Sequence, residues 1–146
     1  MKEHSKFFLN SLSETKSFAM RLSKLITFRK CICLKGKLGI GKTTLVRFML
    51  NSYNKKPIKV TSPTFSLVNI YDLKKIRVWH YDLYRIKKKI EVYNLDLELA
   101  LNDCTIIEWP EIVEDILPND RINLTLEERS KDIIEVTLSS KNIILL

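Results

Sequence analysis

The sequence predicts an α/β fold: a single domain spanning residues 1–146, with a central, mainly parallel sheet flanked by helices and a C-terminal antiparallel hairpin. Three observations favour this fold. Short apolar runs typical of strands alternate with longer segments in which apolar residues recur at helical spacing. One apolar run leads through a glycine-rich segment into a helix. The chain then closes with two segments that alternate apolar and polar residues, as hairpin strands do.

The first third of the chain is predicted to hold two helices and one strand. Residues 1–10 follow neither pattern and are expected to be a loose lead-in. Residues 13–28 show helical spacing, with Ser13 as the expected N-cap. Residues 31–34 are apolar on both faces, as a buried parallel strand requires. Residues 43–53 return to helical spacing.

The rest of the chain supplies further strands and two short helices. Residues 58–71 alternate apolar and polar side chains in two strand-like halves, joined by Ser62-Pro63-Thr64. Another apolar run begins at residue 104 and ends at Glu108, and it is predicted to form a further strand. The remaining predicted elements are a strand at 76–81, a leucine-rich helix at 91–101, a short helix at 110–117, and hairpin strands at 121–126 and 133–138.

The glycine-rich segment, residues 36–44, matches the pattern G-x-x-x-x-G-K-[ST] and contains all 3 glycines of the chain. This pattern forms a phosphate-binding loop when it follows a strand and opens a helix, and both conditions hold, so we expect a P-loop NTPase-type domain. Backbone N–H groups would cradle phosphate oxygens, Lys42 would reach the β- and γ-phosphates, and the Thr43 hydroxyl would bind Mg²⁺. The expected nucleotide-binding residues of the loop are Gly36, Lys37, Leu38, Gly39, Ile40, Gly41, Lys42, Thr43 and Thr44.

Two carboxylates follow predicted strands and are candidates for the chemistry. Asp82 comes directly after the strand at 76–81, and Glu108 ends the next apolar run. Acidic residues at such positions hold Mg²⁺ or water in enzymes with phosphate loops. His80 is a possible ligand or base, although packing in the core is the interpretation we favour. For Ser62-Pro63-Thr64, spacing alone leaves open whether the two hydroxyls contact a ligand or only connect strands.

Charge and composition restrict the partners. The formal net charge of +8 and a pI near 9.4 suit an anionic partner such as a nucleotide, RNA or an acidic protein surface. The lysine run at 87–89 favours a solvated surface over an RNA-binding patch. Cys31, Cys33 and Cys104 are expected to be reduced and buried. The sequence has no apolar run of about 18 residues and no signal peptide, so we expect a cytoplasmic protein that does not span a membrane.

The motifs also separate the classes of phosphate-loop protein. A GTP switch protein needs an Asp-x-x-Gly turn, but no glycine lies outside residues 36–41, and an Asn-Lys-x-Asp guanine reader is absent. ATP is therefore the expected nucleotide. The residues alone leave three functions open. They are an ATPase, a small kinase with Arg85 and residues 87–89 as a lid, and a nucleotide-sensing module that binds RNA through its basic surface.

Four motifs occur along the chain in a fixed order. They are the loop at 36–44, Ser62-Pro63-Thr64-Phe65, His80-Tyr81-Asp82-Leu83-Tyr84-Arg85 and Ile107-Glu108-Trp109-Pro110-Glu111. Together they resemble the TsaE (YjeE) family, the bacterial ATPase of threonylcarbamoyladenosine formation in tRNA. The resemblance covers about residues 10–140. It implies a compact α/β domain that hydrolyses ATP with Mg²⁺ and acts with the TsaB–TsaD heterodimer, which modifies the tRNA; direct contact with tRNA stays open.

The resemblance also implies roles for single residues. Thr43 and Glu108 match the Mg²⁺ positions, and Asp82 matches the acidic residue needed for hydrolysis. With Lys42, the two carboxylates form the expected catalytic set. Ser62 and Thr64 match a switch-like segment near the γ-phosphate, and Lys131 lies near the position of a basic residue that approaches the nucleotide. Two positions depart from the family pattern: Asp96 stands where glycine is usual, and Lys37 where an acidic residue is common.

Overall fold

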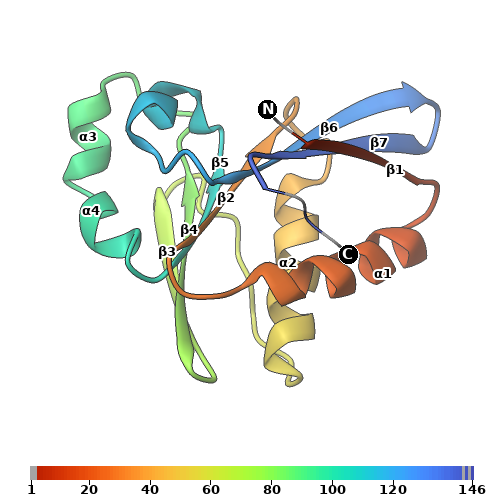
Figure 1. Cartoon of the computed structure of the whole chain (residues 1–146), viewed down its shortest axis with the longest axis horizontal. Helices are drawn as coiled ribbons and strands as arrows, with labels where there is room; N and C mark the ends of the chain where they lie inside the picture. Colours follow the sequence, from red (N-terminus) through yellow and green to blue (C-terminus); the bar gives the residue numbers. More distant parts are fainter. Residues whose placement is uncertain (1–2, 143, 145) are drawn as a thin grey trace.

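The computed structural model describes residues 3–142, 144 and 146 and shows a seven-stranded sheet with helices on both faces (Figure 1). The strand order across the sheet is β1-β7-β6-β2-β5-β4-β3. In chain order the elements, with η for a 3-10 helix, are β1 (Glu3–Leu9), α1 (Leu12–Leu22), η1 (Ser23–Leu25), β2 (Lys30–Lys35), α2 (Lys42–Asn54), β3 (Val68–Leu73), β4 (Ile76–Asp82), α3 (Lys89–Tyr93), α4 (Leu97–Ala100), β5 (Cys104–Glu108), η2 (Pro110–Ile116), β6 (Ile122–Ser130) and β7 (Ile133–Ser140).

The central strands are parallel, and antiparallel strands flank them at both edges. β2 pairs in parallel with β5 and with β6, and β5 pairs in parallel with β4. At one edge β3 joins β4 in an antiparallel hairpin. At the other edge β7 and then β1 add antiparallel to β6. The predicted α/β fold, its mainly parallel centre and its C-terminal hairpin are thus confirmed.

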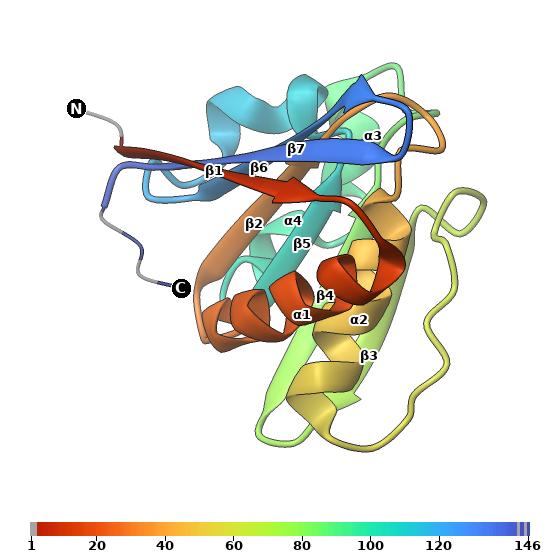
Figure 2. The same ribbon diagram turned by 90° about the vertical axis from the view of Figure 1, so that its right-hand side faces the viewer.

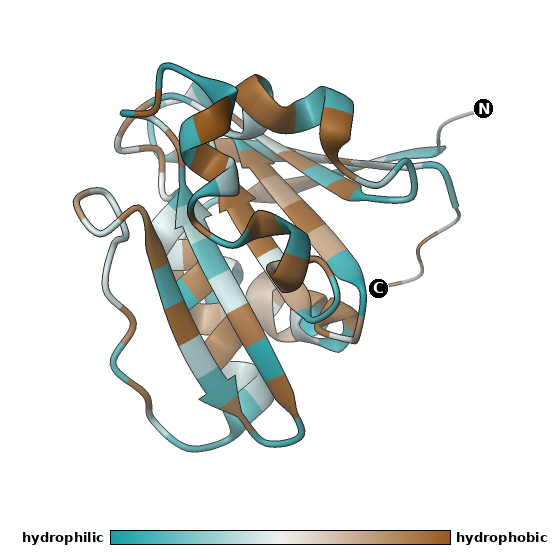
Figure 3. Cartoon of the chain, turned by 90° about the vertical axis from the view of Figure 1, so that its left-hand side faces the viewer, coloured by the Kyte–Doolittle hydropathy of each residue, from teal (hydrophilic) through white to brown (hydrophobic). Residues whose placement is uncertain are grey.

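Each face of the sheet carries its own apolar core, because the central strands are buried on both sides. Helices α1 and α2 cover one face and pack against Ile32 and Ile106 (Figure 2). On the other face α3, α4 and η2 lie over Cys33, Tyr81 and Ile107. Figure 3 looks onto this second face, where the central strands behind the helices are mostly apolar. Neighbouring residues of one strand therefore serve different cores, as in other parallel sheets.

The N-terminal segment is a strand, so the prediction of a loose lead-in over residues 1–10 is wrong for 3–9, while residues 1–2 lie outside the described residues. β1 pairs antiparallel with β7 along its whole length. Lys6 Nζ lies 3.1 Å from Glu135 Oε1. The ring of Phe7 packs on that of Phe18 in α1, with 4.8 Å between centres. The strand partners of residues 3–9 are residues 134–140, which are distant in the sequence, so no local pattern predicted this strand.

Helix α1 begins and ends earlier than predicted. Its N-cap is Ser11, not Ser13: the Ser11 hydroxyl accepts from the backbone N–H of Glu14 at 3.1 Å. Glu14 Oε1 in turn accepts from the backbone N–H of Asn10 at 3.3 Å. This reciprocal pair resembles a capping box, in which a serine is followed three residues later by a glutamate. Ser13 therefore lies inside the helix, and the last predicted turn is replaced by η1 and a loop.

Residues 58–61 form no strand, contrary to prediction, and regular pairing starts only at β3. Side chains satisfy backbone groups that a neighbouring strand would otherwise bind. Asn51 Oδ1 accepts from Ile58 N at 2.7 Å, and Asn69 Nδ2 donates to the Thr61 carbonyl at 3.1 Å. The alternating pattern was real, but side-chain hydrogen bonds replace the ladder there.

The helix predicted at 91–101 is divided into α3 and α4 by a turn. Asp96 has φ 60° in this turn, a left-handed conformation that is rare for residues with a Cβ atom and least unfavourable for Asp and Asn. The Tyr81 hydroxyl donates to the Leu95 carbonyl at 2.7 Å and fixes the turn to the sheet. This conformation is the physical reason why glycine would also suit position 96.

The three cysteines are buried and free, as predicted. Burial raises the pKa of Cys104 to about 12, so its thiol stays protonated and packs as a small apolar group. Within residues 3–142, none of the helices has the length and apolar content needed to cross a bilayer.

Candidate functional site

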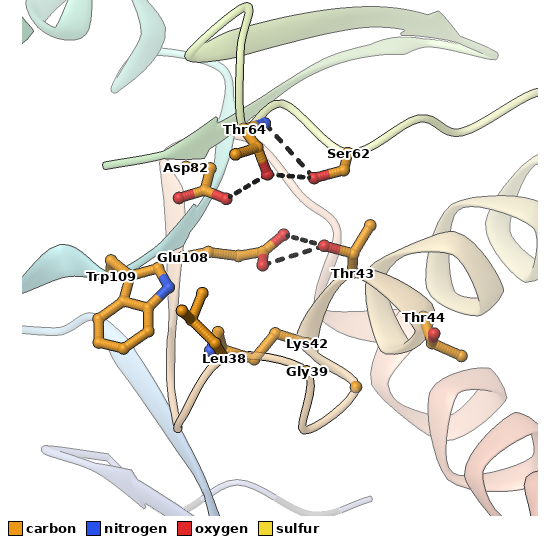
Figure 4. Close-up of a pocket in the computed structure, with 11 residues that line it drawn as sticks. Leu38, Gly39, Lys42, Thr43, Thr44, Ser62, Thr64, Asp82, Glu108 and Trp109 are labelled. Carbon is orange, nitrogen blue, oxygen red and sulfur yellow. Dashed lines mark hydrogen bonds between the residues drawn. The ribbon is translucent and has the colours of Figure 1, made fainter. Parts of the chain in front are cut away.

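The phosphate-loop residues and both candidate carboxylates meet at one edge of the sheet. In the parallel register Glu108 lies beside Leu34 of β2 and beside Asp82 of β4, so the carboxyl ends of three strands are level. Ligands of open α/β sheets bind in the crevice outside these strand ends. A cavity of about 250 Å³ lies there (Figure 4). Its lining residues are Leu38, Gly39, Gly41, Lys42, Thr43, Thr44, Ser62, Thr64, Asp82, Glu108 and Trp109.

The loop between β2 and α2 needs glycine at fixed points. A Cβ atom on Gly36 would lie 2.9 Å from the carbonyl oxygen of Leu126, a contact that β6 cannot relieve without shifting. Gly41 has φ 116° and is the N-cap of α2, where no side chain caps the helix. The first N–H groups of a helix have no intrahelical partner, and they carry the positive end of the helix dipole. The start of α2 is therefore ready to bind an anion.

The Lys42 ammonium folds back onto the loop that precedes it. Nζ donates to the Gly36 carbonyl and, at 3.0 Å, to the Lys37 carbonyl. Lys42 is only 5% exposed. Burial lowers the pKa of Lys42, while the carboxylates of Glu108 and Asp82 act in the opposite direction. Neutral carbonyls compensate a buried cation poorly, so phosphate oxygens would be better partners for this group.

Glu108 is the most enclosed acidic group of the site, at 2% exposure. Thr43 Oγ1 donates to its carboxylate, lying 3.1 Å from Oε1 and 3.0 Å from Oε2. His80 Nε2 lies 2.6 Å from Oε2 on the buried side. An ionised carboxylate can only accept, so with Glu108 ionised the Nε2–H of His80 is the donor. The histidine and the threonine together fix the orientation of the carboxylate.

The donor set around Glu108 fits Mg²⁺. Between residues 3 and 142 no group of three or more His, Cys, Asp or Glu side chains is arranged to hold a metal ion by itself. Mg²⁺ does not need such a cage in nucleotide sites, because it binds one or two protein oxygens, phosphate oxygens and water. The buried carboxylate of Glu108 and the hydroxyl of Thr43 that it contacts are protein oxygens of this kind.

Asp82 lies next to Glu108 and joins the sheet to the Ser62-Pro63-Thr64 segment. Its Oδ2 accepts from the Thr64 hydroxyl at 3.2 Å, and its Oδ1 accepts from the backbone N–H of Tyr84 at 3.0 Å. The hydroxyls of Ser62 and Thr64 lie 2.6 Å apart. Figure 4 shows the hydroxyls above the Glu108–Thr43 pair and Lys42 below it. Polar groups from four parts of the chain thus surround one cavity: the start of α2, the segment at 62–64, and the ends of β4 and β5.

The comparisons with known proteins agree with this geometry. A family model described as "Threonylcarbamoyl adenosine biosynthesis protein TsaE" matches residues 9–136. The chain belongs to the TsaE family. This confirms the resemblance carried by the four motifs, and it connects the chain with threonylcarbamoyladenosine biosynthesis in tRNA.

Individual relatives and one solved structure support the assignment to the TsaE family. A protein named tRNA threonylcarbamoyladenosine biosynthesis protein TsaE from Rickettsia prowazekii is 37% identical over 131 residues, covering 88% of this chain and 91% of that protein. Its namesake from Rickettsia bellii is 36% identical over 137 residues, covering 92% and 95%. A crystal structure of Bacillus subtilis YdiB matches with a TM-score of 0.79 over 97% of this chain and 88% of that chain, at 22% identity, and so shows the same fold.

Most residues predicted for the TsaE site come together, and a few lie apart from the cavity. Gly36, Lys37 and Ile40 belong to the loop but do not line the 250 Å³ space. Lys37 instead forms an ion pair with Glu128 of β6, at 2.6 Å. Lys131 lies in the turn between β6 and β7 and is not a lining residue. Its approach to a nucleotide stays a prediction.

Two residues make contacts at the site that the sequence did not predict. His80 was interpreted as a packed histidine; it is fully buried, but it also bonds Glu108. The available signal was spacing, because residues 80 and 82 share one face of a strand. Trp109 lines the cavity, and its ring centre lies 4.3 Å from Lys42 Nζ and 4.8 Å from the Tyr84 ring centre. Trp109 belongs to one of the four motifs, but its residue type alone did not predict a place in the cavity wall.

The basic segment after Asp82 makes local contacts. Arg85 lies over the ring of Phe65, 5.2 Å from its centre. The backbone N–H groups of Lys87 and Lys88 donate to Glu91 Oε2, and Lys89 pairs with Asp115. The run at 87–89 therefore starts α3 and lies partly in ion pairs, which agrees with the favoured interpretation as a solvated surface.

Proposed function

We propose that this TsaE family member binds ATP with Mg²⁺ and hydrolyses it, as a subunit of the bacterial machinery that forms threonylcarbamoyladenosine in tRNA. The observation that carries the proposal is the contact between Thr43 and Glu108. This contact joins a hydroxyl in the first turn of α2 to a buried carboxylate. Lys42 of the phosphate loop lines the same cavity. In phosphate-loop enzymes a lysine, a hydroxyl and a carboxylate of this kind bind the phosphates and Mg²⁺ of a nucleoside triphosphate.

Binding uses the loop and the start of α2. The uncapped N–H groups of α2 would donate to phosphate oxygens, and Lys42 would exchange the carbonyls of Gly36 and Lys37 for the β- and γ-phosphates. Thr43 and Glu108 would hold Mg²⁺, which supplies neutralisation of charge on the β- and γ-phosphates when bound. His80 would keep the Glu108 carboxylate turned toward the cavity.

Hydrolysis is assigned to the wall formed by Asp82 and Thr64. Asp82 is 6% exposed and borders the cavity beside Glu108. A carboxylate at this position can accept a hydrogen bond from water and orient it toward the terminal phosphate. The hydroxyls of Ser62 and Thr64, which bond one another and Asp82, would rearrange around that phosphate.

The partner proposed for this chain is the TsaB–TsaD heterodimer, which performs the transfer to tRNA, so the chain itself needs no direct tRNA contact. Apolar side chains stand exposed around the cavity, which is typical of a surface that contacts another protein: Leu38 is 59% exposed, Phe65 84% and Tyr84 48%. The ATPase is expected to be slow alone and to act in the cytoplasm.

Phosphate release from ATP tests the proposal. The full chain is assayed with Mg²⁺ or with EDTA, and with or without the TsaB–TsaD heterodimer. We expect release into water that needs Mg²⁺ and rises when the heterodimer is added. ADP formation that requires a phosphate acceptor would instead identify a small kinase. RNA affinity that Lys42→Ala leaves unchanged, without ATP hydrolysis, would identify an RNA-binding module.

A further inference from the structure

The positive charge of the chain is concentrated in one stretch of the sequence. Residues 15–71 contain 12 of the 25 lysines and arginines and none of the 17 aspartates and glutamates. The rest of the chain holds 13 basic and 17 acidic residues, so the formal net charge of +8 comes entirely from this stretch. It includes most of α1 and all of α2, which cover one face of the sheet (Figure 2). Glu14 is the only acidic residue of these two helices.

A groove of about 380 Å³ lies between α1 and the C-terminal half of α2. Its lining residues are Lys16, Met20, Phe48, Asn51, Ser52, Lys55, Lys56 and Pro57. None of these eight residues is acidic, and none of them lines the cavity beside Glu108. At a rise of about 1.5 Å per residue, Lys55 lies roughly 20 Å along α2 from Lys42, so the groove is separate from the proposed nucleotide site.

The lysines of the groove come from both helices and lack an anionic partner. Among residues 3–142, no carboxylate forms an ion pair with Lys16, Lys55 or Lys56, whereas Lys37 pairs with Glu128. The C-terminal end of a helix favours cations, which accounts for Lys55. It does not account for Lys16, which lies in the middle of α1. An anion bound between these like charges would relieve their repulsion.

The backbone that carries Lys55 and Lys56 is held by hydrogen bonds. Lys55 has φ 59° and caps α2, and its N–H donates to the Asn51 carbonyl at 3.1 Å. Asn54 Nδ2 donates to the Lys56 carbonyl at 3.2 Å, and Asn51 Oδ1 accepts from Ile58 N at 2.7 Å. Two adjacent lysines therefore stand on an ordered turn, which reduces the entropy lost when a ligand binds.

The groove also offers an apolar surface, formed by Met20, Phe48 and Pro57. Met20 is 56% exposed, and Phe48 is half-buried. Proteins hold single-stranded nucleic acid with such a combination, because bases stack on aromatic and apolar side chains while cations bind the phosphates. A paired helix keeps its bases inside and would leave the apolar surface empty. The groove therefore fits an unpaired nucleotide.

An RNA strand fits this surface better than an acidic protein segment. The acid-free stretch extends well beyond the groove, and Arg47 and Lys59 are also exposed on it. Such an extended surface attracts a long polyanion. The family to which the chain belongs is named for threonylcarbamoyladenosine biosynthesis in tRNA, so RNA is the polyanion of this pathway.

We infer that the groove between α1 and the C-terminal half of α2 binds an unpaired nucleotide of an RNA strand, with Lys16, Lys55 and Lys56 on the neighbouring phosphates. The inference goes beyond the proposed function, which needs no contact between this chain and tRNA.

Fluorescence anisotropy of a labelled, unmodified tRNA transcript with the full chain tests the inference. Lys55→Ala/Lys56→Ala should weaken binding by about 10-fold at physiological salt and lower the slope of log affinity against log salt by about 1 to 2. Met20→Asp should weaken binding without removing a lysine, and Met20 is exposed, so this variant keeps its fold. Lys87→Ala/Lys88→Ala is the matched control, because it removes two adjacent exposed lysines before α3, on the other face of the sheet. It should stay within about 3-fold of wild type.

Two further probes identify the ligand. A fully paired RNA duplex should bind wild type about 10-fold more weakly than tRNA, because it offers no unpaired base. Poly-glutamate of equal total charge should compete with tRNA only weakly. Equal affinity for the duplex would refute the contact with an unpaired nucleotide. Competition by poly-glutamate as strong as that by unlabelled tRNA would identify an acidic protein as the partner and refute RNA.

The outcomes separate the groove from general charge and from the proposed function. If wild type does not bind tRNA, or if Lys55→Ala/Lys56→Ala and Met20→Asp leave the affinity unchanged, the groove is not an RNA site. An equal loss in Lys87→Ala/Lys88→Ala would also refute it, since overall charge would then explain the binding. ATP binding should be the same in all these variants, because none of the substituted residues lines the cavity beside Glu108. Absence of ATP binding in wild type would refute the proposed function and leave the RNA result standing.

Discussion

The two walls of the charged cavity are built in different ways. The phosphate loop, residues 36–41, joins β2 directly to α2, and a buried lysine bonds its carbonyls. The opposite wall, residues 57–67, has no regular pairing. Only scattered contacts hold its position, such as those of Asn51 with Ile58 and Asn69 with Thr61.

This difference indicates which wall responds to a ligand. A loop held by its own glycines and by two regular elements is organised before the ligand arrives. A segment held by a few separate hydrogen bonds, without a strand or helix ladder, opens at lower free-energy cost than a regular element. We therefore expect the phosphate loop to determine affinity and the segment at 57–67 to report the state of the γ-phosphate. Asp82 bonds Thr64 and borders Glu108, so it connects the two walls.

The largest effect is expected from a substitution that removes the phosphate contacts of the phosphate loop. Lys42→Ala removes the buried cation of the loop and should abolish measurable ATP binding. In wild type, ATP at 100 times its dissociation constant should stabilise the fold by about 2.7 kcal/mol, and the variant should show no such rise. Thermal unfolding with and without ATP measures this difference.

Lys37→Ala is the matched control, because it removes the same charge from the same loop, but from a side chain that pairs with Glu128. It should keep most of the ATP-dependent rise in melting temperature. An unchanged rise in Lys42→Ala would show that the loop does not bind the phosphates.

The second largest effect is expected from substitutions of Asp82 and Glu108, and the two should affect ATP binding differently. Asp82→Asn should keep ATP binding and lower hydrolysis by about 10²- to 10⁴-fold, because a group that orients or deprotonates water acts mainly in the transition state. Glu108→Gln should weaken Mg²⁺-dependent binding as well as hydrolysis. Binding is measured by calorimetry, and hydrolysis with the TsaB–TsaD heterodimer present. Support of tRNA modification should fall with hydrolysis.

Asp72→Asn provides the control, since Asp72 is an exposed aspartate on β3 that pairs with Arg77. It should behave as wild type in both measurements. Normal hydrolysis by Asp82→Asn would remove Asp82 from the mechanism, and exchanged phenotypes would exchange the water and metal roles.

The third largest effect concerns the hydrogen bond between His80 and Glu108. His80→Leu replaces the imidazole by an apolar side chain of similar size. It removes the hydrogen bond to Glu108 and should raise the Mg²⁺ concentration for half-maximal ATP binding by about 10- to 100-fold. His80→Gln can place an amide donor near the position of Nε2 and should recover most of the loss. If both variants need the same Mg²⁺ concentration as wild type, His80 only packs.

The smallest effect concerns the wall formed by residues 57–67. Hydrogen exchange at residues 61–66 should be slower with a non-hydrolysable ATP analogue than with ADP, while exchange in the phosphate loop should be slow with both. Asn69→Ala removes the contacts to Thr61 and should quicken exchange at 58–66, at a global cost of about 1 kcal/mol.

Asn102→Ala removes an exposed amide that bonds a helical carbonyl far from this wall, and serves as the control. If hydrogen exchange at residues 61–66 is equally fast with the ATP analogue and with ADP, the segment does not respond to the γ-phosphate and only connects α2 to β3.

The parts of the molecule that the sequence predicted are those governed by short-range patterns. The glycine-lysine-threonine order specifies the loop and the start of α2, and apolar runs specify the buried strands. Asp82 and Glu108 could be assigned to one edge because each directly follows such a run. Their direct adjacency comes from the pairing of β4 with β5, which the structure shows.

The parts that escaped prediction depend on partners distant in the sequence. The bond between His80 and Glu108 exists only because β4 and β5 are neighbours in this register. The segment at 58–61 has the pattern of a strand, yet the Asn51 and Asn69 side chains take its hydrogen bonds. The left-handed Asp96 that divides α3 from α4 had only an indirect signal, the glycine usual at its position in the family pattern.

The pairing of β1 with β7 has a consequence for how the protein is made. Residues 3–9 find their partners at 134–140, so β1 cannot join the sheet until those residues have been translated. At about 5–20 residues per second, this interval lasts roughly 6 to 26 s. Phe7, Phe8 and Leu9 are without their strand partners during that time. Because this strand is synthesised early and paired late, we expect the nascent chain to need protection from aggregation on the ribosome.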